Sequence, residues 1–130
     1  MSRIVLLIED NEQNAYLVKV LLEPHGYKVV VATHGARGIE LARTIRPDVI
    51  LLDIQLPTMD GYTTARHLRG IEALRDVPII AVTSYAMLGD REKALEAGCT
   101  GYIEKPIAPE TFVTEVEQFG KLRPTGEETQ

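Results

Sequence analysis

The sequence lacks several features that mark whole classes of protein. Its 130 residues include one cysteine, Cys99, which excludes an internal disulfide bond and a metal site built from several cysteines. The first apolar run covers residues 4–8 and stops at Glu9, so it is too short for a signal peptide or a membrane-spanning helix. A net charge of −5 argues against a general nucleic-acid surface, because phosphate backbones attract basic patches. We therefore expect a cytoplasmic protein with no membrane and no nucleic-acid partner.

What the sequence does contain is a set of short apolar runs, rich in Val and Ile, that do not alternate with polar residues. They cover residues 4–8, 29–32, 49–52, 78–82 and 101–103. Such runs are typical of strands that are buried on both faces. The segments between them have helical spacing, so strands and helices alternate along the chain. This order predicts the α/β class, with a five-stranded parallel sheet that is covered by helices on both faces.

The length of the chain fits one domain of ordinary size. We expect residues 1–120 to form this domain and the polar residues 121–130 to be a disordered tail. The sequence contains no internal repeat and no low-complexity linker that would indicate a second domain.

Local signals predict where some helices begin. Asn11 and Asp60 are suited to cap the first and third helices. Pro109 is suited to the first position of the last helix, where its missing N–H does no harm. Gly89 falls inside the expected fourth helix, which indicates either a later helix start or a helix that is loosely held.

Polar residues whose side chains can bind ligands or take part in a reaction follow the expected strands. Glu9 and Asp10 end the first apolar run, Asp53 ends the third, and Thr83 and Lys105 follow two later ones. Ligand sites in parallel sheets lie beyond the carboxyl ends of the strands. Each residue alone has an ordinary structural explanation, such as a helix cap or a solvated loop. Their coincidence at the ends of four strands predicts one functional site.

Clustered carboxylates repel one another and need a cation. We expect Mg²⁺, with Mn²⁺ as an alternative, bound directly by Asp10 and Asp53 and by the backbone carbonyl of Gln55, while Glu9 acts through water. A free oxygen of Asp53 could then attack a phosphoryl group, a known form of covalent catalysis by carboxylates. Lys105 and the hydroxyl of Thr83 would pair with the phosphoryl oxygens. The pattern therefore favours phosphoryl chemistry on a carboxylate.

The chain resembles the receiver domains of two-component response regulators over residues 3–120. The motifs that match are Glu9-Asp10, Asp53, Thr83 and Lys105-Pro106, with the segments 53–61 and 97–106 around them. Each motif alone is moderately specific, and together and in order they are very specific. The resemblance implies a flavodoxin-like fold with strand order 2-1-3-4-5.

The resemblance also implies a phosphorylation switch. A histidine kinase or a histidine phosphotransfer protein would donate a phosphoryl group to Asp53 with magnesium. Thr83 would move toward the phosphoryl group, and Tyr102 would turn inward to fill the vacated space. The surface built from the fourth helix, the fifth strand and the fifth helix would then change its affinity for a downstream protein. That surface covers residues 85–97, 101–104 and 110–120.

Further residues take family roles by position. Gln55 and Tyr85 fall where members tune phosphoryl hydrolysis, and we hypothesise that the bulky Tyr85 slows the access of water. Pro106 is a candidate for a cis peptide bond. The protein would be a bacterial phosphoacceptor switch and not an enzyme, although it would assist its own phosphorylation and dephosphorylation. It would be a monomer, with dimerisation on phosphorylation left open.

The sequence allows several interpretations of the protein's function. Because the sequence ends soon after the fifth helix, we expect a stand-alone receiver whose output is another protein. The alternative is an intermediate receiver of a longer phosphorelay or a fragment of a hybrid kinase. An enzyme on a similar fold is disfavoured, because no P-loop or dinucleotide fingerprint occurs and Gln55 stands where aspartyl-phosphate hydrolases carry a second acid. A degenerate receiver that binds without phosphorylation has little support, since every expected pocket residue is present.

Overall fold

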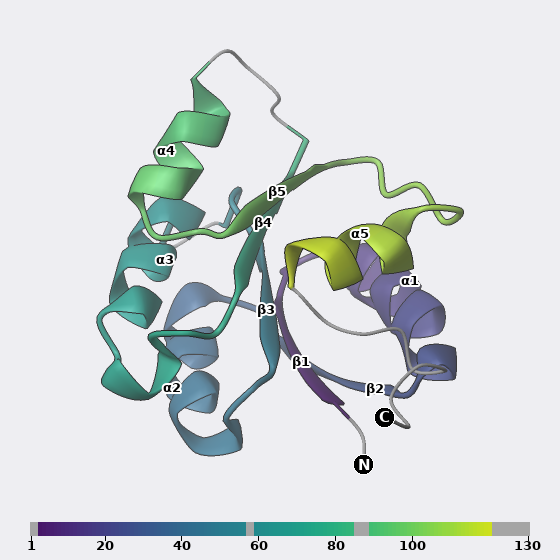
Figure 1. The fold of residues 1–130 in the computed structure, drawn as a ribbon, viewed down its shortest axis with the longest axis horizontal. Helices are drawn as coiled ribbons and strands as arrows, with labels where there is room; N and C mark the ends of the chain where they lie inside the picture. Colours follow the sequence, from purple (N-terminus) through teal and green to yellow (C-terminus); the bar gives the residue numbers. More distant parts are fainter. Residues whose placement is uncertain (1–2, 57–58, 85–88, 121–130) are drawn as a thin grey trace.

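A computed structural model describes residues 3–56, 59–84 and 89–120. Five parallel strands form one sheet in the order β2-β1-β3-β4-β5, and helices lie on both of its sides (Figure 1). The strands are β1 (Arg3–Ile8), β2 (Tyr27–Ala32), β3 (Val49–Asp53), β4 (Ile79–Thr83) and β5 (Gly101–Glu104). The predicted fold class and strand order are therefore confirmed, and each predicted strand differs from the observed one by at most two residues at either end.

In the described part of the chain, four α-helices connect the strands and a fifth follows β5. They are α1 (Glu12–Leu22), α2 (Gly35–Ile45), α3 (Gly61–Arg69), α4 (Asp90–Glu96) and α5 (Phe112–Phe119), with single 3-10 turns at Glu23–His25 and Glu72–Leu74. Helices α2, α3 and α4 cover one face of the sheet, and α1 and α5 cover the other (Figure 1). None of the helices in the described part of the chain is long and apolar enough to span a bilayer.

The central strands are buried because they supply side chains to two separate cores. Along β3, Ile50 and Leu52 pack with α2 and α3, whereas Val49 and Leu51 pack with α1 and α5. All four side chains have no exposed surface. This division follows from the two-residue period of a strand, and it explains why the sequence shows a continuous apolar run there instead of an alternating one.

The predicted helix caps at Asn11 and Asp60 are confirmed. Asn11 Oδ1 accepts a hydrogen bond from the backbone N–H of Asn14 at 2.9 Å, and Asp60 Oδ1 accepts one from Thr63 at 2.8 Å. Each cap satisfies an N–H group that has no partner within its own helix. The first cap also makes α1 begin directly after the loop that follows β1, which is the loop that carries Glu9.

Two predictions about helix starts need correction. Pro109 is not the first residue of the last helix, because it lies in a turn in which Ala108 O accepts hydrogen bonds from Thr111 and Phe112, and α5 begins at Phe112. Gly89 is not inside α4, because it precedes Asp90 with a φ of +95°. The left-handed backbone at Gly89 favours the reading of a later helix start. The predicted residues 85–88 of that helix lie outside the described residues.

Candidate functional site

The strand register brings the ends of β1, β3, β4 and β5 to one edge of the sheet. β1 and β3 stay paired up to the residues before Glu9 and Asp53, so these two acids lie side by side. Thr83 pairs with the last residue of β5, and its carbonyl accepts a hydrogen bond from the N–H of Lys105 at 2.8 Å. With Asp10, which follows Glu9, all five residues that the sequence placed at strand ends lie along this edge.

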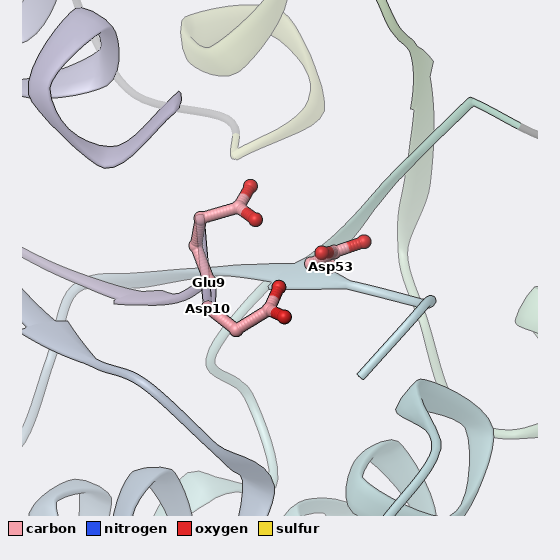
Figure 2. A group of neighbouring side chains, drawn as sticks. All are labelled: Glu9, Asp10 and Asp53. Carbon is pink, nitrogen blue, oxygen red and sulfur yellow. The ribbon is translucent and has the colours of Figure 1, made fainter. Parts of the chain in front are cut away.

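Three of these residues form a compact group of carboxylates. Figure 2 shows Glu9, Asp10 and Asp53 with their carboxylates turned toward a common space, and an oxygen of each lies within 4.8 Å of the others. Glu9 and Asp53 are each 3% exposed, whereas Asp10 is open to solvent. Two buried acids next to a third are unfavourable unless a positive charge compensates them.

Lys105 supplies part of that compensation. Its Nζ lies 3.0 Å from Glu9 Oε1 and 3.5 Å from Asp53 Oδ2. The lysine side chain is only 13% exposed, so both ion pairs are largely screened from water. Because the lysine side chain is flexible, its ammonium group can keep its contact with Asp53 when a further anion binds beside that carboxylate.

Backbone N–H groups fix the orientation of the two buried acids. The N–H of Gln55 donates to Asp53 Oδ1 at 3.0 Å, and the N–H of Asn11 donates to Glu9 Oε2 at 3.2 Å. Both donors lie two residues after the acid that they hold, which is the geometry of an Asx-type turn. For Asp53, one carboxylate oxygen is thereby held by the backbone while the other faces Lys105.

The single positive charge of Lys105 does not fully offset the negative charges of the three carboxylates. Burial raises the pKa of Glu9 from its ordinary value of 4.5 to about 7; the hydrogen bond from Lys105 opposes this rise, and the neighbouring Asp53 adds to it. A carboxyl group with such a pKa is partly protonated at neutral pH in the absence of further positive charge. A bound divalent cation would favour the ionised form.

The donor set fits a hard divalent cation. Three carboxylates offer oxygen ligands within a few ångströms of one another, and Mg²⁺ prefers such ligands while it keeps several waters. The exposed Asp10 leaves the site open to the solvent from which a cation and its waters would come. Among the described residues this is the one group of three or more metal-binding side chains that lie together.

An open cleft of about 510 Å³ lies over the carboxylates. Its walls include Lys105 and, from three different loops or helix starts, Asn14, Gln55 and Ser84. Asn14 lies in the first turn of α1 and lines the cleft. The hydroxyl of Ser84 donates a hydrogen bond to Gln55 Oε1 at 2.6 Å. No signal in the sequence predicted this contact, because it joins two loops 29 residues apart.

The remaining predicted residues differ in their position relative to the cleft. Thr83 is 1% exposed at the end of β4, directly before Ser84. Tyr102 is half-buried on β5, packs against the core on the α2–α4 face and is not among the residues that line the cleft. The Lys105–Pro106 peptide bond is cis. Tyr85 lies outside the described residues.

Comparison with known proteins identifies the family to which this site belongs. Residues 5–117 match the response regulator receiver domain. The chain belongs to this family. Its members are switch proteins of two-component signalling, which take phosphoryl groups from histidine kinases or phosphotransfer proteins and act on downstream targets. The resemblance stated from the motifs is thus confirmed.

Individual relatives agree with this assignment. The polar-differentiation response regulator DivK of Brucella anthropi is 40% identical over 119 residues, which make up 92% of this chain and 97% of DivK. The receiver domain of the sensor histidine kinase PA1611 from Pseudomonas aeruginosa, whose crystal structure has a magnesium ion coordinated in the active-site cleft, is 36% identical, with a TM-score of 0.84 over 93% of this chain and 99% of that one. The chemotaxis protein CheY4 of Vibrio cholerae is 26% identical, with a TM-score of 0.87 over 92% and 99% of the two chains.

Proposed function

We propose that this receiver domain accepts a phosphoryl group on Asp53 from a histidine kinase or a histidine phosphotransfer protein. The observation that carries the proposal is the position of Asp53, whose Oδ2 lies 3.5 Å from Lys105 Nζ within the group of three carboxylates. The chain would act as a switch and would assist its own phosphorylation and dephosphorylation without being an enzyme. We also propose that it works in the cytoplasm, where its donor would act.

The transfer is a substitution at phosphorus. A carboxylate oxygen of Asp53 forms a bond to the phosphorus atom of the donor, the bond between phosphorus and the donor's histidine nitrogen breaks, and the nitrogen keeps the electron pair. Lys105 then pairs with a phosphoryl oxygen, and Thr83 donates its hydroxyl hydrogen to another. Most of the rate comes from positioning and charge neutralisation, which the hydrogen bond from Gln55 to Asp53 supports.

We further propose that Asp10, Asp53 and the backbone carbonyl of Gln55 hold Mg²⁺ directly and that Glu9 holds it through water. The compact donor set and the raised pKa of Glu9 support this assignment. When bound, the cation supplies neutralising charge for the phosphoryl oxygens. Mn²⁺ has similar oxygen chemistry and would serve with the same ligands.

The output of the switch would be the surface of α4, β5 and α5. There, Tyr102 lines a groove of about 430 Å³ together with Arg91 of α4, Glu104 of β5 and Glu115 of α5. Because all three elements contribute to one groove, a movement of Thr83 and Tyr102 would change the surface that a partner protein meets. The protein would be a monomer that binds this partner, with dimerisation through the same face as an alternative outcome of phosphorylation.

A second candidate function is that of a receiver within a longer phosphorelay or a hybrid kinase. The likeness to the receiver domain of the sensor histidine kinase PA1611, at 36% identity over nearly the whole of that domain, favours it. In that case phosphorylated Asp53 would pass its phosphoryl group on to a histidine of a phosphotransfer protein. Transfer of labelled phosphate from the purified phosphorylated protein to such a histidine would distinguish this role from that of a stand-alone switch.

The proposal is tested by intact mass after incubation with a small-molecule phosphodonor such as acetyl phosphate, with and without Mg²⁺. We expect a base-labile gain of one phosphoryl group that requires both the cation and Asp53. Asp53→Asn should abolish the gain, while the control Asp76→Asn, which changes an exposed acid outside the cleft, should retain it. A gain that persists in Asp53→Asn, or no gain in a folded protein with Mg²⁺, would contradict the proposal.

A further inference from the structure

The side chain of Gln55 joins the loop after β3 to the loop after β4 across the cleft. Its Oε1 accepts a hydrogen bond from Ser84 Oγ at 2.6 Å and lies 3.4 Å from Ser84 N. Both residues line the same cleft as Asp53. A carbonyl oxygen that receives a short hydroxyl hydrogen bond is held in direction as well as in distance.

Gln55 is tied to the reacting group on its other side. Its backbone N–H donates to Asp53 Oδ1 at 3.0 Å, so the base of the side chain is fixed relative to the phosphoacceptor. Ser84, in turn, directly follows Thr83, the hydroxyl residue of the proposed switch. The contact therefore joins Gln55, two residues after Asp53, to Ser84, which directly follows Thr83.

The same amide oxygen has a second potential use. Loss of the phosphoryl group requires a water oxygen to attack phosphorus while the bond from phosphorus to the Asp53 oxygen breaks. The carboxylate then leaves with the electron pair, inorganic phosphate forms, and the excess proton of the water goes to solvent. An amide oxygen in the cleft can accept a hydrogen bond from that water and orient it, as glutamines do in some phosphate-hydrolysing enzymes. An oxygen already bound to Ser84 is less available for this.

We propose that Ser84 is a positioning residue that occupies Gln55 Oε1, keeps it from orienting attacking water, and so prolongs the lifetime of the phosphoryl group on Asp53. The inference rests on the proposed function and deepens it, since it assigns a determinant of the lifetime to a contact between two loops. The effect of Ser84 must act through Gln55, which separates this role from simple steric shielding of the cleft.

The test is a double-mutant cycle on the rate of phosphoryl loss. Wild type, Ser84→Ala, Gln55→Ala and the double variant are phosphorylated with acetyl phosphate and Mg²⁺, the donor is removed, and the remaining phosphoprotein is followed by intact mass. We expect Ser84→Ala to speed the loss roughly three- to ten-fold, the effect of one hydrogen bond. In the Gln55→Ala background the same change should have no effect, and Ser84→Thr, which keeps the hydroxyl, should behave like wild type. Equal acceleration in both backgrounds, or none in either, would overturn the proposal.

A second measurement examines the contact without phosphorylation. In ¹⁵N-labelled protein, the side-chain amide resonances of Gln55 should shift in Ser84→Ala and return toward the wild-type position in Ser84→Thr. Identical Gln55 resonances in wild type and Ser84→Ala would overturn the contact itself. If wild type gains no phosphoryl group, the proposed function fails, and the inference about lifetime fails with it. If wild type is phosphorylated and its lifetime ignores Ser84, only the inference fails.

Discussion

At the scale of single residues, the burial of Asp53 beside other carboxylates is expected to lower the stability of the fold. Asp53 is buried within reach of two other carboxylates, and one lysine serves both Asp53 and Glu9. Asp53→Asn removes one negative charge and keeps an oxygen that can accept the hydrogen bond from Gln55. We expect this variant to be more stable than wild type by about 1 kcal/mol in the absence of divalent cations. Urea denaturation in the presence of a chelator measures the difference.

A matched control separates this effect from a general benefit of lost negative charge. Glu72→Gln changes an acid whose side chain is 89% exposed, so its unfolding free energy should stay within about 0.5 kcal/mol of wild type. Adding Mg²⁺ should raise the unfolding midpoint of wild type more than that of Asp53→Asn, since the variant has lost one carboxylate of the proposed cation site. Equal or lower stability of Asp53→Asn in chelator would show that repulsion among the carboxylates is already relieved.

The residues of the site differ in how far they could be predicted. Glu9, Asp10, Asp53 and Lys105 each lie within two residues of the end of an apolar run, so a sequence pattern predicts their place at the sheet edge. The hydrogen bond between Ser84 and Gln55 could not be predicted, because it depends on how two loops approach each other in space. The raised pKa of Glu9 also needed the structure, since it follows from burial and not from sequence neighbours.

At the scale of elements, Arg69 at the end of α3 joins the nearby loop before β4 to the turn after α4, which is 29 residues away in the chain. Its Nη1 donates to the carbonyls of Leu74, Arg75 and Val77 at 2.8–2.9 Å, and its Nε and Nη2 donate to Gly98 O at 3.0 and 2.8 Å. The guanidinium thus satisfies carbonyls of the loop before β4 and of the turn after α4. Only a planar group with several N–H donors can hydrogen-bond to the carbonyls of both segments at the same time.

We expect Arg69→Lys to lower the free energy of unfolding by about 2 kcal/mol. An ammonium group keeps the charge but cannot reach both sets of carbonyls, so some of them lose their partner. Arg66→Lys, on the exposed side of the same helix, is the control and should change stability little. Urea denaturation at neutral pH provides the comparison, and equal stability of the two variants would mean that water replaces the lost hydrogen bonds.

The elements themselves were predictable where burial dictates their sequence. The buried strands show as apolar runs, and the caps at Asn11 and Asp60 follow from side chains that compete for backbone N–H groups. The predicted start of α5 was wrong, because a proline suits both the first position of a helix and a turn that precedes it. Here Pro109 lies in the turn. The strand order came from the family resemblance, because apolar runs carry no information on which strands are neighbours.

At the scale of the whole molecule, a buried tyrosine connects the edge strand β2 to the last helix. Tyr27 is 3% exposed, and its hydroxyl donates to Glu117 Oε2 at 2.8 Å across 90 residues of sequence. Burial, with the hydrogen bond to Glu117 as the next cause, raises the pKa of Tyr27 from its ordinary value of 10.0 to about 12. The folded protein therefore holds this proton more tightly than the unfolded chain does.

The sign of the pH dependence follows from this difference. Below pH 10 the hydroxyl is protonated in both states and its contribution to stability is complete; between pH 10 and about 12 the unfolded chain ionises first, so the contribution is lost as the pH rises. We expect about 2 kcal/mol of alkaline destabilisation in wild type that is missing in Tyr27→Phe. Because lysines and other tyrosines also titrate in this range, the quantity to measure is the difference in unfolding free energy between wild type and variant at pH 8 and pH 11.5. Tyr16→Phe, which changes a tyrosine that is 71% exposed, should follow wild type at both values, and a Tyr27→Phe protein with the same alkaline loss as wild type would show that Tyr27 ionises without opposing the fold.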